Sequence, residues 1–329
     1  MLPNIEERKR VLQEEEYGFL PERPTKVEVE LLFEDGAFCA RRAPLQKFLL
    51  KAEVYGKTVQ FPFCFCVPKC VQKPVKTVVA LNFESQVPNK YFPAEEIIDN
   101  GWAFACVCYK DVTDDSPTMD ENAKILSTKS ETGKLMMWAW AAMRILDYLQ
   151  TRDDIDCNNV GVLGHSRLGK TALLTGAFDE RFAFVHSNDS GSSGAALYRS
   201  ACDGSEKIEV ISRVFSYWFC KKFRSYANRE KELPFDQHYL LSLIAPRVLS
   251  VGSAELDFWA NPQGELDGAR LASEAWAECG ETGLIAPETA KTGVNYHDGR
   301  VGYYVRDGGH YFAREDWNRV LAFFEKHLR

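Results

Sequence analysis

Several features are missing from this 329-residue chain, and each absence excludes a class of protein. No apolar run reaches the roughly 18 residues that a membrane-spanning helix needs, so we expect no membrane partner. Positive charge is not in excess: the formal net charge is −7, which argues against a nucleic-acid partner. Residues 1–24 are highly charged and lack the apolar core of a secretory signal, so we expect a cytoplasmic location.

Zinc-ligand spacing is also missing, although the chain has ten cysteines. Two C-x-C pairs alternate with apolar residues, which places both thiols of a pair on one face of a strand; they are Cys64 with Cys66 and Cys106 with Cys108. Zinc sites combine a C-x2-4-C pair with a second pair or with histidines at matching spacing, and none follows here. We therefore expect free thiols, no metal and no other cofactor. The oligomeric state is not readable from the sequence.

What the chain does contain is an ordinary globular mixture, with 45% hydrophobic and 26% charged residues. Antiparallel strands are indicated first, at 26–33, 48–55 and 57–67. Short buried strands then alternate with helical patterns. The strands are at 77–83, 102–109, 160–163, 182–186, 247–251 and 301–306, and the helices at 135–149, 170–178 and 316–328. This order predicts an α/β fold whose mostly parallel sheet is covered on both faces.

We expect one domain over residues 1–329, because no linker marks a boundary. Its first 25 residues are expected to form a charged, solvated helix or arm. Long connections at 190–233 and 261–296 are expected to build a cap or wall around a site at the carboxyl ends of the strands.

The most informative segment is a buried strand that turns tightly into a helix. Gly164–Thr171 formally matches the phosphate-binding pattern G-x-x-x-x-G-K-[ST]. The same turn also matches a nucleophile elbow, in which the Ser166 hydroxyl is exposed at the apex and backbone N–H groups face a developing oxyanion. Three bulky side chains inside the turn disfavour a phosphate loop, and an acid and a histidine follow in the hydrolase order. We therefore predict the elbow, although its second glycine comes one residue late; a nucleotide-binding protein is the remote alternative.

A serine hydroxyl needs a general base, and the chain has six histidines. His310 follows the last predicted strand on a glycine-rich loop and precedes the final helix, where the base of a Ser–acid–His hydrolase belongs. His165 and His186 are expected to be packed, and His297 is expected to be a solvent-exposed or substrate-side loop residue.

Two aspartates could hold the tautomer of that histidine. Asp257 follows the strand at 247–251, which is the usual position of a hydrolase carboxylate. Asp189 follows the preceding strand and could also reach the imidazole. We favour Asp257, and Asp189 stays open as the alternative.

Several ordered motifs resemble the bacterial glucuronoyl esterases of carbohydrate esterase family 15. They are GHSRLGK at 164–170, DERF at 179–182, SNDSG at 187–191, GAAL at 194–197, LPFDQH at 233–238, IAPR at 244–247, DFWANP at 257–262, and the pairs at 309–310 and 316–317. The resemblance runs from about residue 76 to the end of the chain. It implies an α/β-hydrolase fold, a three-layer sandwich with N-terminal antiparallel strands.

The resemblance also implies the reaction and the roles of individual residues. The family cleaves esters between 4-O-methyl-glucuronic acid on xylan and lignin alcohols, so the expected partner is a carbohydrate (uronate) ester. By resemblance, Ser166 is the nucleophile and His310 the base, and Arg167 helps to stabilise the oxyanion. Lys170 would contact sugar hydroxyls, and Trp259 would pack on or beside the sugar ring.

The chain departs from the family pattern in two places. Asp189 stands where many members carry a catalytic glutamate, whereas other bacterial members use the aspartate two residues before the tryptophan, here Asp257. The glutamine and glutamate sugar contacts of fungal members have no clear counterpart in 205–216. Hydrolysis of acetyl esters, as in an acetyl xylan esterase, is therefore the alternative reaction. Arg167 and Lys170 have a plainer alternative, as salt-bridged or solvated residues of a helix start.

Overall fold

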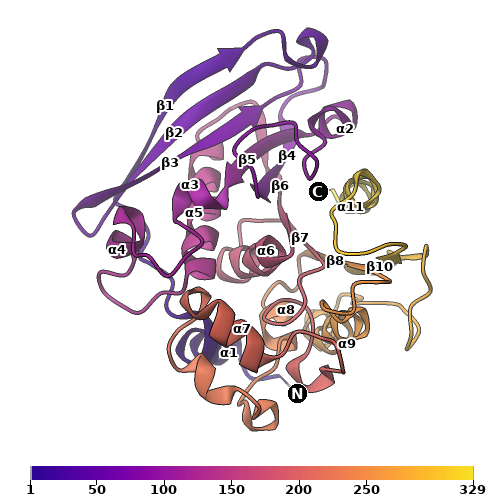
Figure 1. Cartoon of the computed structure of the whole chain (residues 1–329). Coiled ribbons are helices and arrows are strands. Elements are labelled where there is room, and N and C mark those ends of the chain that lie inside the picture. Colours follow the sequence, from indigo (N-terminus) through magenta and orange to yellow (C-terminus); the bar gives the residue numbers. More distant parts are fainter. Residues whose placement is uncertain (1, 329) are drawn as a thin grey trace.

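The computed structural model describes residues 2–328, and one ten-stranded sheet runs through this part of the chain (Figure 1). The strand order is β1-β2-β3-β5-β4-β6-β7-β8-β10-β9. The strands are β1 (Lys26–Asp35), β2 (Leu45–Val54), β3 (Lys57–Cys66), β4 (Val75–Asn82), β5 (Ala103–Cys108), β6 (Ile155–His165), β7 (Phe184–Asn188), β8 (Val248–Ala254), β9 (Asn295–Tyr296) and β10 (Val301–Arg306).

Parallel pairing joins the six central strands from β5 to β10 in this order, and antiparallel pairing joins β1, β2 and β3 at one end and β9 at the other. Every residue of β5, β7, β8 and β10 is buried. Strands buried on both faces read as continuous apolar runs, which is why the sequence indicated them so clearly.

Helices cover both faces of the parallel part, and each face has its own hydrophobic core. The core with α5, α6 and α9 includes Trp138, Leu173 and Leu266, and the core with α2 and α11 includes Ile97 and Phe324 (Figure 1). The α-helices are α1 (Ile5–Leu12), α2 (Ala94–Asp99), α3 (Tyr109–Val112), α4 (Glu121–Leu126), α5 (Lys134–Leu149), α6 (Arg167–Phe178), α7 (Ile208–Val214), α8 (His238–Ser242), α9 (Pro262–Ala272), α10 (Glu274–Glu278) and α11 (Arg314–Lys326). The predicted three-layer α/β fold, with a mostly parallel sheet and N-terminal antiparallel strands, is confirmed.

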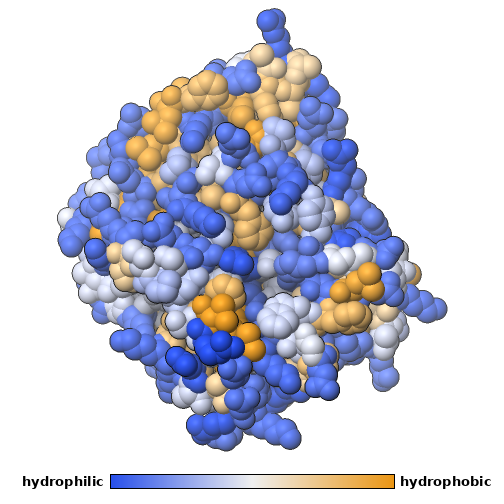
Figure 2. Space-filling model, viewed as in Figure 1, coloured by the Kyte–Doolittle hydropathy of each residue, from blue (hydrophilic) through white to orange (hydrophobic). Residues whose placement is uncertain are grey.

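The antiparallel strands extend away from the helical layers (Figure 1). Hydrophobic side chains gather over them at the upper left of Figure 2, and Leu31, Leu32 and Phe33 of β1 are about half exposed. Among the described residues, none of the helices has the length and apolar character required to cross a bilayer.

The prediction that residues 1–25 form a solvated helix or arm is wrong for the middle of this segment, where Arg8, Val11, Leu12 and residues 15–18 are buried. Helix α1 continues into a π-helical turn over 13–17, and both Glu16 and Tyr17 are fully buried. Glu16 accepts hydrogen bonds from the Tyr198 hydroxyl and from Gln237 Nε2, the latter at 2.8 Å. Burial raises the pKa of Glu16 to about 7, so this carboxyl titrates near neutrality. The high charge of the segment suggested solvent exposure, because the two donors that bury Glu16 lie about 180 or more positions after it in the chain.

The two stretches predicted as cap or wall have different structures. Residues 190–233 contain α7 and several short 3-10 turns and lie beside the N-terminal segment (Figure 1). Residues 261–296 begin with α9, which contacts β8 and β10 and forms part of a helical layer of the sandwich. The expectation of a wall around the site therefore fails for α9, whose amphipathic face covers the sheet.

Candidate active site

The predicted nucleophile lies at the sharp turn between β6 and α6. Ser166 is the single residue between His165, the end of β6, and Arg167, the start of α6. Its backbone has φ 58° and ψ −128°, a conformation that is strained for a residue with a side chain. The turn also requires Gly164, since a Cβ there would lie 2.2 Å from the Leu168 carbonyl oxygen. This backbone has the shape that the elbow interpretation requires.

The favoured acid and base lie in contact. His310 Nδ1 and Asp257 Oδ2 are 2.5 Å apart. Asp257 is buried, whereas the His310 side chain is 42% exposed. Because Asp257 occupies Nδ1, the outer Nε2 atom of the imidazole is the one available to a nucleophile.

The loops that carry this pair are tied together by backbone hydrogen bonds. They follow the neighbouring parallel strands β8 and β10. The N–H of Glu255 donates to the carbonyl of Arg306, and the N–H of Leu256 donates to that of Gly308, both at 2.9 Å. The two loops therefore act as one support for the carboxylate and the imidazole.

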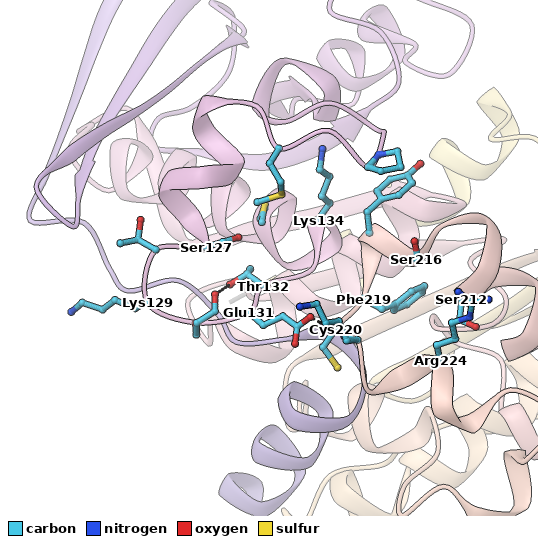
Figure 3. A pocket seen from close by; sticks show the side chains of 17 residues that line it. Ser127, Lys129, Glu131, Thr132, Lys134, Ser212, Ser216, Phe219, Cys220 and Arg224 are labelled. Atoms are coloured by element: carbon cyan, nitrogen blue, oxygen red, sulfur yellow. Dashed lines mark hydrogen bonds between the residues drawn. The ribbon is translucent and has the colours of Figure 1, made fainter.

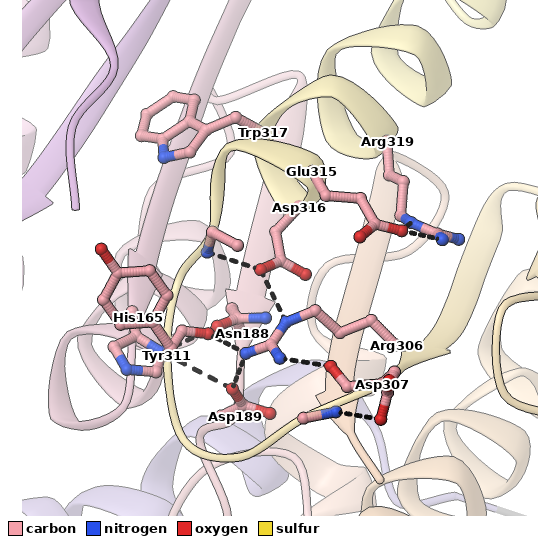
Figure 4. A network of polar contacts seen from close by, with 12 residues as sticks. His165, Asn188, Asp189, Arg306, Asp307, Tyr311, Glu315, Asp316, Trp317 and Arg319 are labelled. Atoms are coloured by element: carbon pink, nitrogen blue, oxygen red, sulfur yellow. Dashed lines mark hydrogen bonds and ion pairs between the residues drawn. The ribbon is translucent and has the colours of Figure 1, made fainter. Parts of the chain in front are cut away.

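Asp189, the alternative acid, lies in a different environment. It is buried in a positive-φ conformation (φ 44°), and neither carboxylate oxygen has a hydrogen-bond partner. Its nearest charged or ionisable partners are Arg306 Nη2 at 3.5 Å and His165 Nδ1 at 3.8 Å (Figure 4). Burial, with the nearby Glu265 carboxylate, raises the pKa of Asp189 well above its ordinary value. Of the two candidates, the structure brings Asp257 to the base.

Three other histidines differ in their surroundings. His165 is buried, bonds Asn188 Oδ1 through Nδ1 at 2.7 Å, and has its ring 4.5 Å from that of His310. Burial lowers the pKa of His165 to about 3, so it stays neutral beside the base. His186 is a core residue bonded to Ser250. His297 was expected to be a solvent-exposed or substrate-side loop residue, but it is half-buried and its ring packs 4.4 Å from that of Phe323 on α11. No motif near His297 indicates this contact across the fold.

One cluster offers the ligand types of a metal site. One ligand atom each from His165, Asp189 and His310 lie within 4.8 Å of one another. Tetrahedral ligands about 2.0 Å from a zinc ion lie about 3.3 Å from one another, whereas His165 Nδ1 and Asp189 Oδ2 are 3.8 Å apart. The Arg306 guanidinium also lies beside the carboxylate, which disfavours a second cation there.

Arg167 follows Ser166, and its guanidinium is held by Asp115 and by aromatic rings. Its Nη1 atom donates to Asp115 Oδ2, and its guanidinium lies 4.9 Å from the Trp218 ring centroid. The carboxylate also accepts a 2.8 Å bond from the Trp218 indole. Although burial opposes it, that bond and the charge of Arg167 lower the pKa of Asp115 below its ordinary value. Arg167 therefore does form a salt bridge, as the plainer alternative expected, and the bridge to Asp115 fixes the orientation of the guanidinium. Asp115 was missed because it lies in a long loop with no motif of its own.

Lys170 does not point a free ammonium at the site. It is buried, and its Nζ atom donates to the carbonyls of Ser190 (2.6 Å) and Ser192 and to Glu206 Oε2 (3.1 Å). An ammonium has three donors, so all are used within the protein. Direct contact with sugar hydroxyls, as the resemblance implied, would require one of these bonds to be released. The same holds for contact with a phosphate.

Glu206 is the residue that sequence reasoning missed here. It lies within the stretch 205–216, which showed no clear sugar contact, but its backbone N–H donates to the Trp259 carbonyl at 2.9 Å. Trp259 is half-exposed, as are its apolar neighbours Leu256 and Phe258. An apolar, partly aromatic rim therefore flanks Asp257.

A cavity of about 930 Å³ lies between the α4–α5 connection and the segment after α7 (Figure 3). Its lining does not include Ser166, Asp257 or His310. Tyr217 belongs to the wall of this cavity and donates a hydrogen bond to Asp115 Oδ1 at 3.2 Å. Asp115 also binds Arg167, so this carboxylate lies between the cavity wall and the guanidinium.

Comparisons with known proteins agree on one family. The family model described as "Glucuronyl esterase, fungi" matches residues 50–280. Carbohydrate esterase MZ0003 from an unknown prokaryotic organism is 40% identical over 203 residues, which are 61% of this chain and 46% of that protein. The 4-O-methyl-glucuronoyl methylesterase of Hypocrea jecorina is 34% identical over 163 residues, which are 47% of this chain and 35% of that protein.

A solved structure covers nearly the whole chain. The glucuronoyl esterase from Solibacter usitatus matches with a TM-score of 0.88 and 30% identity, covering 98% of this chain and 91% of that one. The match to the two curated relatives, in contrast, spans less than half of their length.

Proposed function

Since this chain belongs to the glucuronyl esterase family, we propose that it is a serine carboxylic-ester hydrolase that cleaves esters of (4-O-methyl-)glucuronic acid. The resemblance read from the motifs is confirmed by the family match. The single observation that carries the reaction type is the contact of His310 with Asp257 next to the strained Ser166 turn.

The reaction would proceed through an acyl-enzyme. His310 Nε2 takes the proton of Ser166 as Oγ attacks the ester carbonyl, and the imidazolium that forms is stabilised by Asp257. Collapse of the tetrahedral intermediate transfers that proton to the leaving alcohol. Water, deprotonated by the same histidine, then attacks the acyl group and releases the uronic acid and the Ser166 hydroxyl.

The oxyanion would be stabilised at the start of α6. The backbone N–H of Arg167 is the first of this helix, and helix geometry gives it no intrahelical acceptor. The partial positive charge of the helix N-terminus adds to this donor. The guanidinium of Arg167, oriented by Asp115, supplies a full charge on the same residue.

The sugar would lie toward Trp259 and Glu206. The exposed indole of Trp259 offers a flat apolar face to a sugar ring. The buried Lys170–Glu206 pair supports this residue, because the Glu206 N–H donates to the Trp259 carbonyl. The apolar side chains of Leu256 and Phe258 favour a leaving alcohol with an apolar or aromatic group.

The test is hydrolysis of methyl and benzyl glucuronate, methyl galacturonate and nitrophenyl acetate by the wild type and by Ser166→Ala. We expect glucuronate turnover that is lost in the variant. Acetate cleavage alone would replace the uronate substrate by an acetyl ester while keeping the serine mechanism. Absence of turnover, or equal turnover by the variant, would contradict the hydrolase.

A further inference from the structure

Arg306 lies at the base of the loop that carries the catalytic histidine. It is the last residue of β10 and is buried. Residues 307–313 form neither helix nor strand, and His310 itself is exposed. A side chain on such a loop keeps one position only if other groups hold the backbone.

The guanidinium of Arg306 binds this backbone on both sides of His310. Its Nη1 atom donates to the carbonyl of Asp307 at 2.8 Å. Its Nη2 atom donates to the carbonyls of Gly309, at 2.9 Å, and Tyr311. The three acceptors surround the histidine, so the loop is wrapped around a single planar cation (Figure 4).

The other edge of the guanidinium is anchored in the fold. Nε donates to Asp316 Oδ2 at 2.9 Å, and the same oxygen accepts the Ala313 N–H at the start of α11. The Asp189 carboxylate lies 3.5 Å from Nη2. Arg306 therefore connects the loop to a helix on one side and to the end of β7 on the other.

We propose that Arg306 is a positioning residue for the hydrolytic reaction: it holds the 307–311 loop so that His310 stays between Asp257 and Ser166. The role rests on the proposed serine mechanism but not on the identity of the ester. Five N–H donors in one plane can serve a carboxylate and three carbonyls together, whereas the tetrahedral ammonium of lysine cannot. Loss of this support displaces the imidazole from its productive position, and a displacement of about 1 Å can cost about 100-fold in rate.

The first test compares Arg306→Lys with the matched control Arg314→Lys, whose arginine lies on α11 and pairs with Glu96 at the surface. We expect kcat of Arg306→Lys to fall about 10- to 100-fold with KM changed less than about 3-fold, because substrate contacts are untouched. The control should keep both constants. Unchanged kcat in Arg306→Lys would overturn the role.

The second test separates positioning from general stability. In a His310→Ala background, Arg306→Lys should change the residual rate less than about 2-fold, because the residue acts only through that imidazole. A further large loss there would mean that Arg306 is merely structural. The double variant Arg306→Met/Asp316→Asn removes the guanidinium together with the carboxylate that it hydrogen-bonds. This variant should still show the low kcat, and a normal kcat would contradict the proposal.

A substrate-independent readout keeps this proposal distinct from the proposed function. The rate at which a fluorophosphonate labels Ser166 reports the activated serine whichever ester is natural. If the wild type is labelled but hydrolyses no uronate ester, the substrate assignment fails, and slower labelling of Arg306→Lys still supports the positioning role. Equal labelling rates would overturn it.

Discussion

Lys170 Nζ lies 3.1 Å from Glu206 Oε2 in a buried ion pair whose glutamate is bonded through its backbone to Trp259. The lysine is one helical turn beyond Ser166 on α6, and the glutamate is 36 positions further along the chain. The pair therefore joins α6, the helix that follows Ser166, to the loop that carries the exposed indole of Trp259.

Replacing this lysine should destabilise the protein. Lys170→Met leaves Glu206 buried without its cation and the carbonyls of Ser190 and Ser192 without their donor, so we expect a loss of about 3 kcal/mol in the free energy of unfolding in urea. Lys51→Met is the control, because its partner Glu30 is exposed and surface pairs contribute less than about 1 kcal/mol. Equal effects of the two variants would contradict the buried pair.

The two candidate acids should differ sharply. Asp257→Asn keeps the shape of the side chain but cannot hold the imidazole in the reactive tautomer, so we expect kcat to fall about 10⁴-fold. Asp189→Asn, measured with the same ester, should retain most of the activity because Asp189 has no hydrogen bond to His310. The reverse ranking would assign the acid to Asp189.

Stability should depend on pH through Glu16. Its pKa is about 7 in the folded protein because of burial, against 4.5 ordinarily, so between these values the folded state binds more protons than the unfolded state. The protonated carboxyl therefore stabilises the fold at acidic pH, and this contribution is lost as the pH rises from about 4.5 through 7.

Glu16→Gln should remove that dependence, which can be measured as the urea-unfolding free energy at pH 5 and pH 8. The expected change in the difference is on the order of 3 kcal/mol. The control is Glu14→Gln, at a half-exposed neighbour that pairs with Arg10 at the surface, and it should leave the wild-type dependence unchanged. A Glu16→Gln profile that coincides with wild type would show that this carboxyl does not titrate with folding.

Phe258 should affect the choice of leaving alcohol. It is exposed beside Asp257, and its removal eliminates apolar contact with an aromatic leaving group. We expect Phe258→Ala to lower kcat/KM for benzyl glucuronate about 5-fold and that for methyl glucuronate much less, since one aromatic contact contributes about 1 kcal/mol. Leu271→Ala, an exposed apolar residue on α9, is the control. Equal losses on both esters would exclude a leaving-group role.

The parts of the protein that were predictable from sequence depend on local patterns. The parallel strands are short apolar runs, and the Ser166 turn has a glycine at a position where no Cβ fits. His310 and Asp257 could be found because each follows a strand of the parallel series, and the carboxyl ends of such strands lie at one edge of the sheet.

The rest depends on contacts between distant segments. Glu206 has no motif around it and becomes recognisable only when its partner Lys170 is known. In the sequence Arg306 is only a polar residue at the end of a predicted strand. Its three acceptors are backbone carbonyls, which any residue type has, so no motif indicates them. Glu16 was expected to be exposed because it lies in a charged segment, and its buried donors, Tyr198 and Gln237, are far from it in the sequence.

The burial of Glu16 and Tyr17 bears on how this protein can be handled and engineered. Tyr17 donates to the Ser193 carbonyl at 2.9 Å, and the neighbouring carbonyl of Ser192 is a ligand of Lys170. Proteolytic trimming of the first twenty residues would thus remove contacts to the loop that holds Lys170 of α6, the helix that follows Ser166. Affinity tags and surface attachment are better placed away from this segment, on the protruding hairpin of β1 and β2, which is remote from the loops that carry Asp257 and His310.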